Sequence, residues 1–239
     1  GYTMEELERI LHPMGEEAKE ATGSMGDDTP IAILSDKYRP LSHFFRQKFS
    51  QVTNPPIDSI REQSRMSLKT RFGNLRDVLD SNSYQDSVFV MDSPVVTNSI
   101  FNKMLKFGKD EAVNIDCCFP ITNITLKEKI KSIQDEAEAA VLSGKQHIIL
   151  TDINANNENV SVPMILATAA VHSSLTMKGI RSFISLHVQS AECLDTHYFA
   201  VLIGVGATTV NPYLAQECIR ERHEKGLFGN YSYEECVER

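Results

Sequence analysis

The sequence has no tryptophan, few cysteines and no long apolar run. Its five cysteines are an odd number, and only Cys117 and Cys118 are adjacent, so the paired framework of small secreted domains is missing. No Cys-x-x-Cys or His-x-x-x-His spacing occurs, which leaves zinc or iron–sulfur ligation without support. We therefore expect reduced thiols and no metal in this chain.

Basic residues are also few. The chain has 24 Lys and Arg residues and 32 Asp and Glu residues, for a net charge of -8. Nucleic acid and anionic membranes both require a basic face, so neither is expected as a partner. The chain also lacks a segment long enough to span a bilayer and the basic-then-apolar profile of a signal peptide. We expect a cytoplasmic location, or a plastid if the source is a photosynthetic eukaryote.

From residue 87 onwards, short apolar segments alternate with helical patterns. The segments expected to be strands are Ser87–Met91, Val113–Cys118, His147–Leu150, Ser182–Val188 and Tyr198–Val205. The expected helices are Asn98–Phe107, Thr125–Ser143, Pro163–Lys178 and Asn211–Lys225, and they end at Gly108, Gly144, Gly179 and Gly226. Parallel βα units with right-handed crossovers leave two topologies, a doubly wound sheet or a barrel. About six strands, with Ile31–Leu34 as the first, are too few for a closed eight-stranded barrel.

Two Thr-x-x-Glu sequences predict helix starts. Thr3 and Glu6 form a capping box, with Tyr2 placed to pack against Leu7, and Thr125 begins a second box. Residues 68–85 form a polar connection without a clear pattern.

The densest run of aromatic, charged and amide side chains lies at residues 39–62, around Asn54-Pro55-Pro56. The two prolines must end any helix that leads into them, so we predict two helices around a rigid corner. The first carries an apolar stripe from Leu41 to Phe49, and the second, Ser59–Met66, is capped by Asp58. The residues alone leave two readings open, a corner packed against a sheet and a contact surface.

Two irregular motifs near the start of the chain resemble a known family. Residues 23–30 read Gly-Ser-Met-Gly-Asp-Asp-Thr-Pro, and residues 51–58 read Gln-Val-Thr-Asn-Pro-Pro-Ile-Asp. In this order and at this distance they resemble the central domain of the glutamate synthase large (alpha) subunit. The resemblance continues through Ser-Pro-Val-Val-Thr at 93–97 and ends at residues 199–207 and 211–215, so it covers essentially the whole chain.

The resemblance implies a fold and a role. Central domains of this family look like a rudimentary version of the flavin-binding barrel that follows them, so we expect residues 1–239 to be one α/β domain of parallel βα units, an incomplete or rudimentary TIM-barrel-like domain. In the parent enzyme a glutaminase (amidotransferase) domain releases ammonia, which reacts with 2-oxoglutarate, and the imine is reduced to glutamate at FMN in a domain that carries an iron–sulfur cluster. This chain has neither an N-terminal cysteine nor cluster-like cysteine spacing. It is therefore expected to be a connecting domain, without cofactor and inactive alone, that links the glutaminase and FMN/synthase domains.

The candidate surface for those domains and for the ammonia path is the corner. Its polar groups Gln51, Thr53, Asn54 and Asp58 can line a path for a neutral molecule without trapping it by charge. His197 is a further candidate for an interface or for ordering a loop, with a local hydrogen bond as the alternative.

A weaker candidate is an anion site at Gly204, Gly206 and Thr208, because glycines before a helix allow close approach of a phosphate. Thr209 stands where Gly-x-Gly-x-x-Gly would need its third glycine, so a flexible turn is the simpler reading. Together with Asp152 at a strand end, this site supports the alternative function, a free-standing barrel-like small-molecule or phosphate-binding enzyme.

Several positions have simpler structural interpretations. Cys117 and Cys118 are expected to be buried thiols rather than nucleophiles, and His172 a core histidine. The chain departs from its relatives at Thr151-Asp-Ile-Asn154, where Ser-Asp-Arg-Gly is usual, and at Ala191 and Leu194, where glycine and arginine are common. Roles tied to those missing residues are not carried over.

Overall fold

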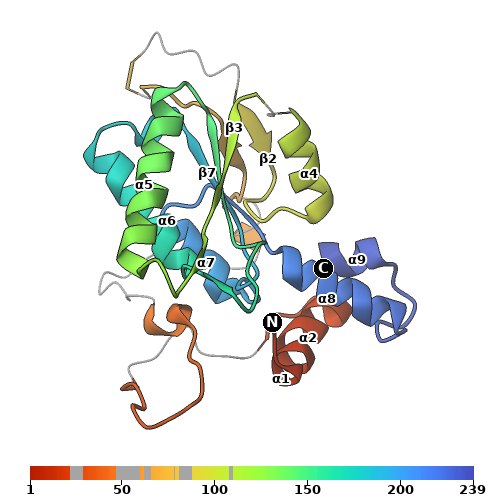
Figure 1. Ribbon diagram of the computed structural model, residues 1–239. Coiled ribbons are helices and arrows are strands. Elements are labelled where there is room, and N and C mark those ends of the chain that lie inside the picture. Colours follow the sequence, from red (N-terminus) through yellow and green to blue (C-terminus); the bar gives the residue numbers. More distant parts are fainter. Residues whose placement is uncertain (22–28, 47–59, 62–65, 78, 81–87, 108–109) are drawn as a thin grey trace.

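The computed structural model describes residues 1–21, 29–46, 60–61, 66–77, 79–80, 88–107 and 110–239. Its centre is a parallel four-stranded sheet in the order β3-β5-β7-β8 (Figure 1). The strands are β3 (Ala112–Asp116), β5 (His147–Thr151), β7 (Ser185–Gln189) and β8 (Thr209–Asn211). Spatial order follows chain order, so each connection leads to the neighbouring strand.

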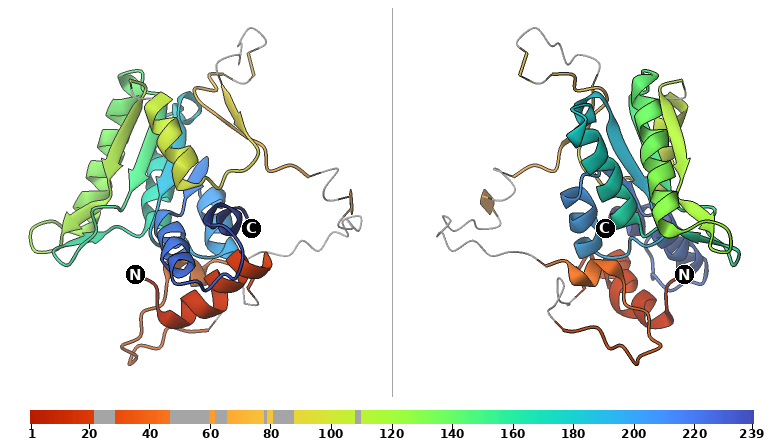
Figure 2. Two further views of the ribbon diagram at one scale, coloured as in Figure 1. Left: turned by 90° about the vertical axis from the view of Figure 1, so that its right-hand side faces the viewer. Right: turned by 60° about the vertical axis from the view of Figure 1, so that its left-hand side comes forward.

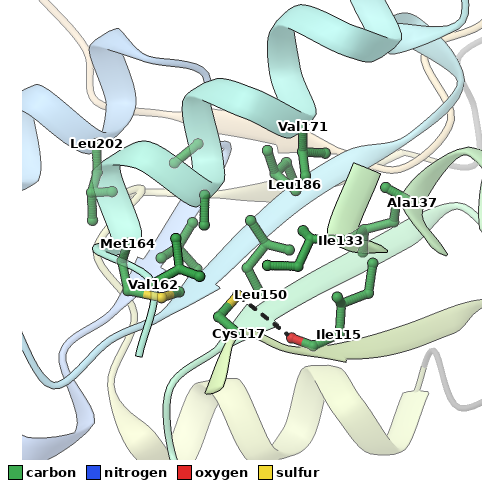
Figure 3. Packing of buried hydrophobic residues seen from close by; sticks show 14 of the residues in the cluster. Ile115, Cys117, Ile133, Ala137, Leu150, Val162, Met164, Val171, Leu186 and Leu202 are labelled. Atoms are coloured by element: carbon green, nitrogen blue, oxygen red, sulfur yellow. Dashed lines mark hydrogen bonds between the residues drawn. The ribbon is translucent and has the colours of Figure 1, made fainter. Parts of the chain in front are cut away.

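One face of this sheet carries the main core. The connecting helices α5 (Leu126–Leu142), α6 (Met164–Met177) and α7 (Thr196–Gly204) supply one side of it, and alternate strand residues such as Leu150 and Leu186 supply the other. Figure 3 shows these side chains packed together, with the Cys117 thiol directed at the carbonyl oxygen of Ile115, 3.8 Å away. Because α6 is apolar on nearly every side, it packs against the sheet and also against α5 and α7.

The second face of the sheet is covered by different elements. They are α4 (Asn98–Phe107) and an antiparallel hairpin of β1 (Thr70–Phe72) and β2 (Phe89–Met91) (Figure 2). A smaller apolar cluster joins Val96, Phe101 and Ile149 there. The amide of Gly73 also donates to the Ser185 hydroxyl at 2.8 Å, which fastens the hairpin to β7.

The N-terminal helices lie at the carboxyl edge of the sheet, together with the last two helices (Figure 1). The N-terminal run consists of α1 (Met4–Glu6), the π-helical turn η1 (Leu7–Leu11) and α2 (His12–Glu17). It packs on α8 (Tyr213–Glu224) and α9 (Tyr233–Glu238) around a second apolar cluster that contains Leu11, Ile219 and Phe228. A two-stranded ribbon of β4 (Cys118–Pro120) and β6 (Asn159–Ser161) extends from the same edge.

Several local predictions are confirmed. Both capping boxes form, with the Thr3 and Thr125 hydroxyls accepting from the Glu6 and Glu128 amides. Helix α4 has the predicted bounds, and helices α5, α6 and α8 end within two residues of their predicted glycines, whose φ angles are positive. Helices α6 and α8 begin one residue after their prolines, because Pro163 and Pro212 occupy the N-cap positions rather than the first turn. Gly108 lies outside the described residues.

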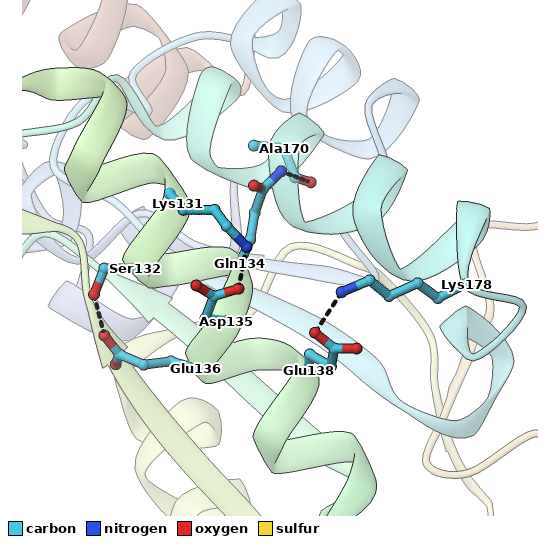
Figure 4. Close-up of polar contacts among 8 residues, drawn as sticks. All are labelled: Lys131, Ser132, Gln134, Asp135, Glu136, Glu138, Ala170 and Lys178. Carbon is cyan, nitrogen blue, oxygen red and sulfur yellow. Dashed lines mark hydrogen bonds and ion pairs between the residues drawn. The ribbon is translucent and has the colours of Figure 1, made fainter.

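The exposed face of α5 is a solvated charged surface. Lys131 pairs with Asp135 one turn away, Ser132 donates to Glu136 at 2.8 Å, and Lys178 of α6 pairs with Glu138 (Figure 4). No helix in the described part of the chain has the length and apolar character needed to cross a membrane.

The predicted strand Tyr198–Val205 is wrong, because residues 198–204 lie in helix α7 and Val205 is its C-cap. A continuous apolar run of this length fits a buried strand and a buried helix equally well. Here Asp195 decides the outcome by accepting from the Tyr198 amide at 2.7 Å, which caps the helix. The neighbouring strands are also shorter than predicted. Ser182 lies in the 3-10 turn η3 (Arg181–Phe183), and β3 ends at Asp116 while Cys118 starts β4.

The predicted first strand, Ile31–Leu34, is also wrong. These residues include a turn, closed by the Ser35 amide donating to the carbonyl oxygen of Ala32 at 2.9 Å. Ile33 and Leu34 are 88% and 95% exposed, so no sheet covers them. The segment is apolar without being buried, and no described strand offers it hydrogen-bonding partners.

The corner segment is only partly described. Its first part is the 3-10 turn η2 (Leu41–Phe44) rather than a longer helix, and Phe45 is already extended. Residues 47–59 and 62–65 lie outside the described part, and with them most of the predicted second helix.

The fold class is confirmed as α/β with parallel βα units. A closed barrel is not seen among the described strands, because β3 and β8 end the sheet without pairing to each other. Segment 94–96 lies beside β8 instead, where the Val210 amide donates to Pro94 and the Val96 amide to Val210, both at 2.8 Å.

Candidate functional site

A row of neutral polar side chains crosses the second face of the sheet at its carboxyl end. Thr151, Gln189 and Asn211 are directly opposite one another in the register of β5, β7 and β8, so their side chains meet. The Thr151 hydroxyl donates to Gln189 Oε1 at 2.8 Å, and Gln189 Nε2 donates to Asn211 Oδ1 at 3.3 Å. Asn211 is fully buried and donates to Val96 O and Asn98 Oδ1 at 3.0 and 2.9 Å. We call Thr151, Gln189 and Asn211 the amide row.

Asp152, the next residue after β5, is the buried charge of this edge. It is 2% exposed, and its carboxylate accepts from the Ala191 amide at 2.9 Å and from the Ser190 hydroxyl at 3.3 Å. Burial raises its pKa to about 6, against the lowering effect of its hydrogen bonds. Asp152 therefore sits in a fixed set of donors that the β7–α7 loop and Tyr213 of α8 provide.

A second buried contact involves Glu192 of the β7–α7 loop. Its Oε2 accepts from the amide of Met164, the first residue of α6, at 3.0 Å, and also from the Tyr198 hydroxyl. A carboxylate at a helix N-terminus is stabilised by the helix dipole. Burial, followed by the charge of Glu192, raises the pKa of Tyr198, so the phenol remains a hydrogen-bond donor. The loop is thereby held against two helices.

The thiols at this edge are not suited to nucleophilic chemistry. Cys117 and Cys118 are both buried, as predicted, and burial raises the pKa of each, that of Cys118 to about 12. The Cys118 thiol donates to the carbonyl oxygen of Asp152 at 3.6 Å. Among the residues that the structure describes, no group of three or more His, Cys, Asp or Glu side chains is placed to hold a metal ion.

Four of the five candidate interdomain residues, Gln51, Thr53, Asn54 and Asp58, lie outside the described residues, and their role stays a prediction. The fifth, His197, is on the first turn of α7, and its Nε2 lies 2.9 Å from the carbonyl oxygen of Ser42. The imidazole thus fastens η2, the start of the corner segment, to the carboxyl edge. The candidate roles of His197, in an interface or in ordering a loop, stay predictions.

The anion-site candidate has a different setting from the one expected. Gly204 is the last residue of α7, and Gly206 and Thr208 lead into β8, so they follow a helix instead of preceding one. A helix C-terminus carries the negative end of the dipole and repels anions. The Thr208 hydroxyl is occupied, since it accepts from the Leu186 amide at 3.1 Å.

Gly206 has a structural role at that position. Its φ of 117° is strained for residues with a side chain, and a Cβ there would lie 2.4 Å from the His172 ring. His172 is half-buried rather than a core residue, and its Nδ1 accepts from Arg181 Nε at 3.1 Å. Arg181 also donates to Gly206 O at 2.8 Å, so the glycine allows a close three-way contact.

The fold and the edge define a class of protein, a singly wound α/β domain whose carboxyl edge carries a neutral, fully hydrogen-bonded amide row. The family follows from comparison with known proteins. The family model described as "Glutamate synthase central domain" matches residues 1–238, and the chain belongs to this family.

Three relatives illustrate the match. The chain is 56% identical over 236 residues to the glutamate synthase [NADPH] large chain of Azospirillum brasilense, covering 98% of this chain and 16% of that one. It is 37% identical over 239 residues to the corresponding Bacillus subtilis chain, covering 99% and 16%. The ferredoxin-dependent glutamate synthase of Pyropia yezoensis is 38% identical over 224 residues, covering 92% and 14%. The chain therefore spans about a sixth of the length of these relatives.

A solved structure of a mutant flavocytochrome b2 with benzoylformate overlaps 48% of this chain and 32% of its own, at 13% identity and a TM-score of 0.37. This overlap is too weak to support any conclusion.

Proposed function

We propose that this chain acts as the central connecting domain of a glutamate synthase, which makes two L-glutamate from L-glutamine and 2-oxoglutarate. The observation that carries the proposal is the match of the central-domain family over residues 1–238, a length that is only 14% to 16% of the relatives. In this proposal the chain links the glutaminase and FMN/synthase domains, is non-catalytic by itself, and forms part of the wall of the ammonia path. We place it in the cytoplasm, or in a plastid in a photosynthetic eukaryote.

The chemistry of the amide row, rather than that of the whole carboxyl edge with its Asp152 and Glu192 carboxylates, supports a wall for a neutral molecule. The amide row is uncharged, and its hydrogen bonds are made within the domain, so it offers polar contact without an ion that would trap ammonium. The corner residues Gln51 and Asn54 add the same chemistry to the segment that His197 fastens to this edge.

The topology supports the rudimentary-barrel part of the proposal. In the four strands, spatial order equals chain order, and α5, α6 and α7 all pack on one face. A doubly wound sheet reverses direction and places helices on both faces, whereas a βα barrel winds in one direction. Winding in one direction favours a barrel segment, and α4 and the β1–β2 hairpin cover the face opposite the connecting helices.

We assign FMN and the iron–sulfur cluster to other domains of the parent enzyme. The described residues do not fit either group, because Gly204 and Gly206 follow a helix C-terminus and the buried thiols lie beside carbonyl oxygens. We therefore propose no reaction of this chain that uses FMN or the iron–sulfur cluster.

The alternative function, a free-standing small-molecule enzyme, is favoured by one observation. Asp152 has a pKa raised to about 6 by burial, in the range of a general acid or base. Its carboxylate, however, already accepts from Ala191 and Ser190, which is the arrangement of a residue that orders a loop.

The test of the connecting role replaces two corner amides in a full-length glutamate synthase that carries this sequence. We expect Gln51→Ala with Asn54→Ala to let ammonia escape, so that glutamine hydrolysis exceeds glutamate formation. The measurement is the ratio of glutamine consumed to 2-oxoglutarate consumed, together with free ammonia.

The matched control replaces one glutamine and one asparagine away from the carboxyl edge, Gln146→Ala with Asn102→Ala. Gln146 precedes β5 at the opposite end of the sheet, and Asn102 is exposed on α4. A corner variant that keeps a one-to-one ratio, as the control should, would refute the role of the corner in the ammonia path.

A further inference from the structure

A cavity of about 270 Å³ lies on the second face of the sheet, away from the amide row, between the β1–β2 hairpin and α4. Its walls come from the β1–β2 hairpin, from α4, and from strands β3, β5 and β7 of the sheet. The wall residues are Phe72, Phe89, Met91, Phe101, Met104 and Ile149. An apolar cavity of about 150 Å³ is enough to bind benzene, so this one has room for a two-ring molecule.

The rings around this cavity are already arranged as aromatic contacts. Phe72 stacks on Phe89 at 5.2 Å with an interplanar angle of 17°, and it meets the His187 ring edge-on at 5.6 Å and 90°. The His147 ring also lies edge-on to Phe72, at 6.0 Å. A flat aromatic ligand can join such a set by stacking on one ring and meeting another with its edge.

The sheet contributes two polar side chains to the described part of the cavity lining, the buried histidines His147 and His187. His187 Nδ1 lies 2.7 Å from the Thr209 hydroxyl, and His187 Nε2 lies 3.1 Å from His147 Nδ1. His147 lines the cavity and is only 6% exposed, yet its Nε2 makes no hydrogen bond with any residue that the structure describes. This nitrogen is open to the cavity, so a bound group can form a hydrogen bond with it.

The proton positions in this chain of contacts are linked. If the Thr209 hydroxyl donates to His187, then His187 donates to His147, and Nε2 of His147 carries the proton. If His187 donates to Thr209, each bond reverses, and Nε2 of His147 accepts instead. The cavity can therefore present either one donor or one acceptor.

The cavity also selects against charge. Burial lowers the pKa of His147, and it lowers that of His187 to about 3, so both rings are neutral at pH 7. Among the described residues that line the cavity, only Lys103 carries a charge, and it is exposed on α4.

We propose that this cavity is a binding site for a small neutral aromatic molecule with one hydrogen-bonding group, which His147 Nε2 engages while Phe72 and Phe89 contact the ring. The ligand class is that of indole and phenol. This site does not depend on ammonia transfer, because it lies on a different part of the domain from the corner and the amide row.

The test compares indole with indene, which has nearly the same shape but no N–H group. The full-length protein is labelled with ¹³C-methyl methionine, and Met91 and Met104 report from the cavity walls. We expect indole to shift both signals and to bind about tenfold more tightly than indene, the factor that one buried hydrogen bond provides.

Two variants separate the hydrogen bond from the apolar walls. His147→Phe keeps a ring but removes Nε2, so indole and indene should bind equally. Met104→Trp should fill the cavity and abolish binding of both, whereas Lys106→Trp, on the same helix but not lining the cavity, should leave it intact. The Met104 variant supplies a test even if His147→Phe fails to fold.

Three outcomes would overturn the proposal. Equal affinity of the wild-type protein for indole and indene would remove the role of His147. Binding that persists in Met104→Trp would place the ligand elsewhere. No shift of the two methionine signals at millimolar indole would show that the cavity is closed, for example by a side chain of another domain.

Discussion

At the scale of single residues, the most informative side chain is Asp152, because it is a buried carboxylate whose ionisation destabilises the folded state. Its pKa in the folded protein is about 6, against an ordinary value of 3.8, and burial is the main cause. A group whose pKa is raised on folding binds more protons in the folded than in the unfolded state between these two values. Its contribution to stability is therefore present below pH 3.8 and lost as the pH rises through 6.

This linkage predicts the behaviour of Asp152→Asn. The amide keeps an acceptor for the Ala191 N–H but cannot ionise, so the variant should gain stability relative to wild type as the pH rises from 4 to 7. The gain is expected to be on the order of 3 kcal/mol, from a difference of about two pKa units. Urea unfolding of both proteins at several pH values measures it. A difference in unfolding free energy that stays constant with pH would contradict the prediction.

At the scale of helices and strands, local chemistry was predictable and the partners of each element were not. Thr125 and Glu128 form their capping box because both ends of the contact lie within four residues of sequence. The pattern of the α7 segment predicts a strand because its apolar run has no helical period, whereas Asp195 before the run caps a helix. A Ser/Thr/Asp/Asn residue before an apolar run is the signal that would have found it.

The amide row shows a different limit. Gln189 and Asn211 were not identified as site residues, since they meet only through the register of β5, β7 and β8. Asp152 is marked in the sequence by its place at a strand end. Its donor Ala191, however, lies 39 residues further along the chain. Sequence position marks the ends of strands, whereas strand pairing decides which ends are neighbours.

The capping boxes give a prediction at this scale. Thr125→Ala removes the acceptor for the Glu128 amide and should cost about 1 kcal/mol, whereas Thr125→Ser keeps the hydroxyl and should cost much less. The measurement is the urea midpoint of the 239-residue chain. Equal midpoints for the alanine variant and wild type would mean that the box adds nothing to the stability of α5.

At the scale of the whole molecule, the second apolar cluster joins the N-terminal helices to the C-terminal ones. Phe228 is its largest fully buried side chain, 1% exposed, with its ring stacked on His12 at 5.0 Å. It also lies over Gly15, where an added Cβ would come within 3.1 Å of the ring. Arg222 of α8 adds an ion pair with Glu8 at 2.7 Å.

Removal of the Phe228 ring should destabilise the contact between the N-terminal and C-terminal helices more than it destabilises the central sheet. Phe228→Ala is expected to destabilise the chain by about 3–5 kcal/mol, the range for a large buried aromatic, and Phe228→Leu by less. Hydrogen exchange is the readout. Protection should fall in residues 4–17 and 233–238 before it falls in β5 and β7, and a uniform loss of protection would show that the two clusters unfold as one unit instead.

The long-range contacts of the N-terminal segments also affect how the chain folds during synthesis. The Tyr2 hydroxyl donates to Cys193 O, the Gly73 amide to Ser185 Oγ, and the Asn98 amide to Gln216 Oε1, with sequence separations of 191, 112 and 118. Strands β3, β5, β7 and β8, by contrast, pair in the order in which they are made. Contacts between distant residues form slowly because the intervening chain must first be closed into a loop. On the ribosome, Tyr2, Gly73 and Asn98 must therefore wait without these partners until the segments that carry Cys193, Ser185 and Gln216 have left the exit tunnel.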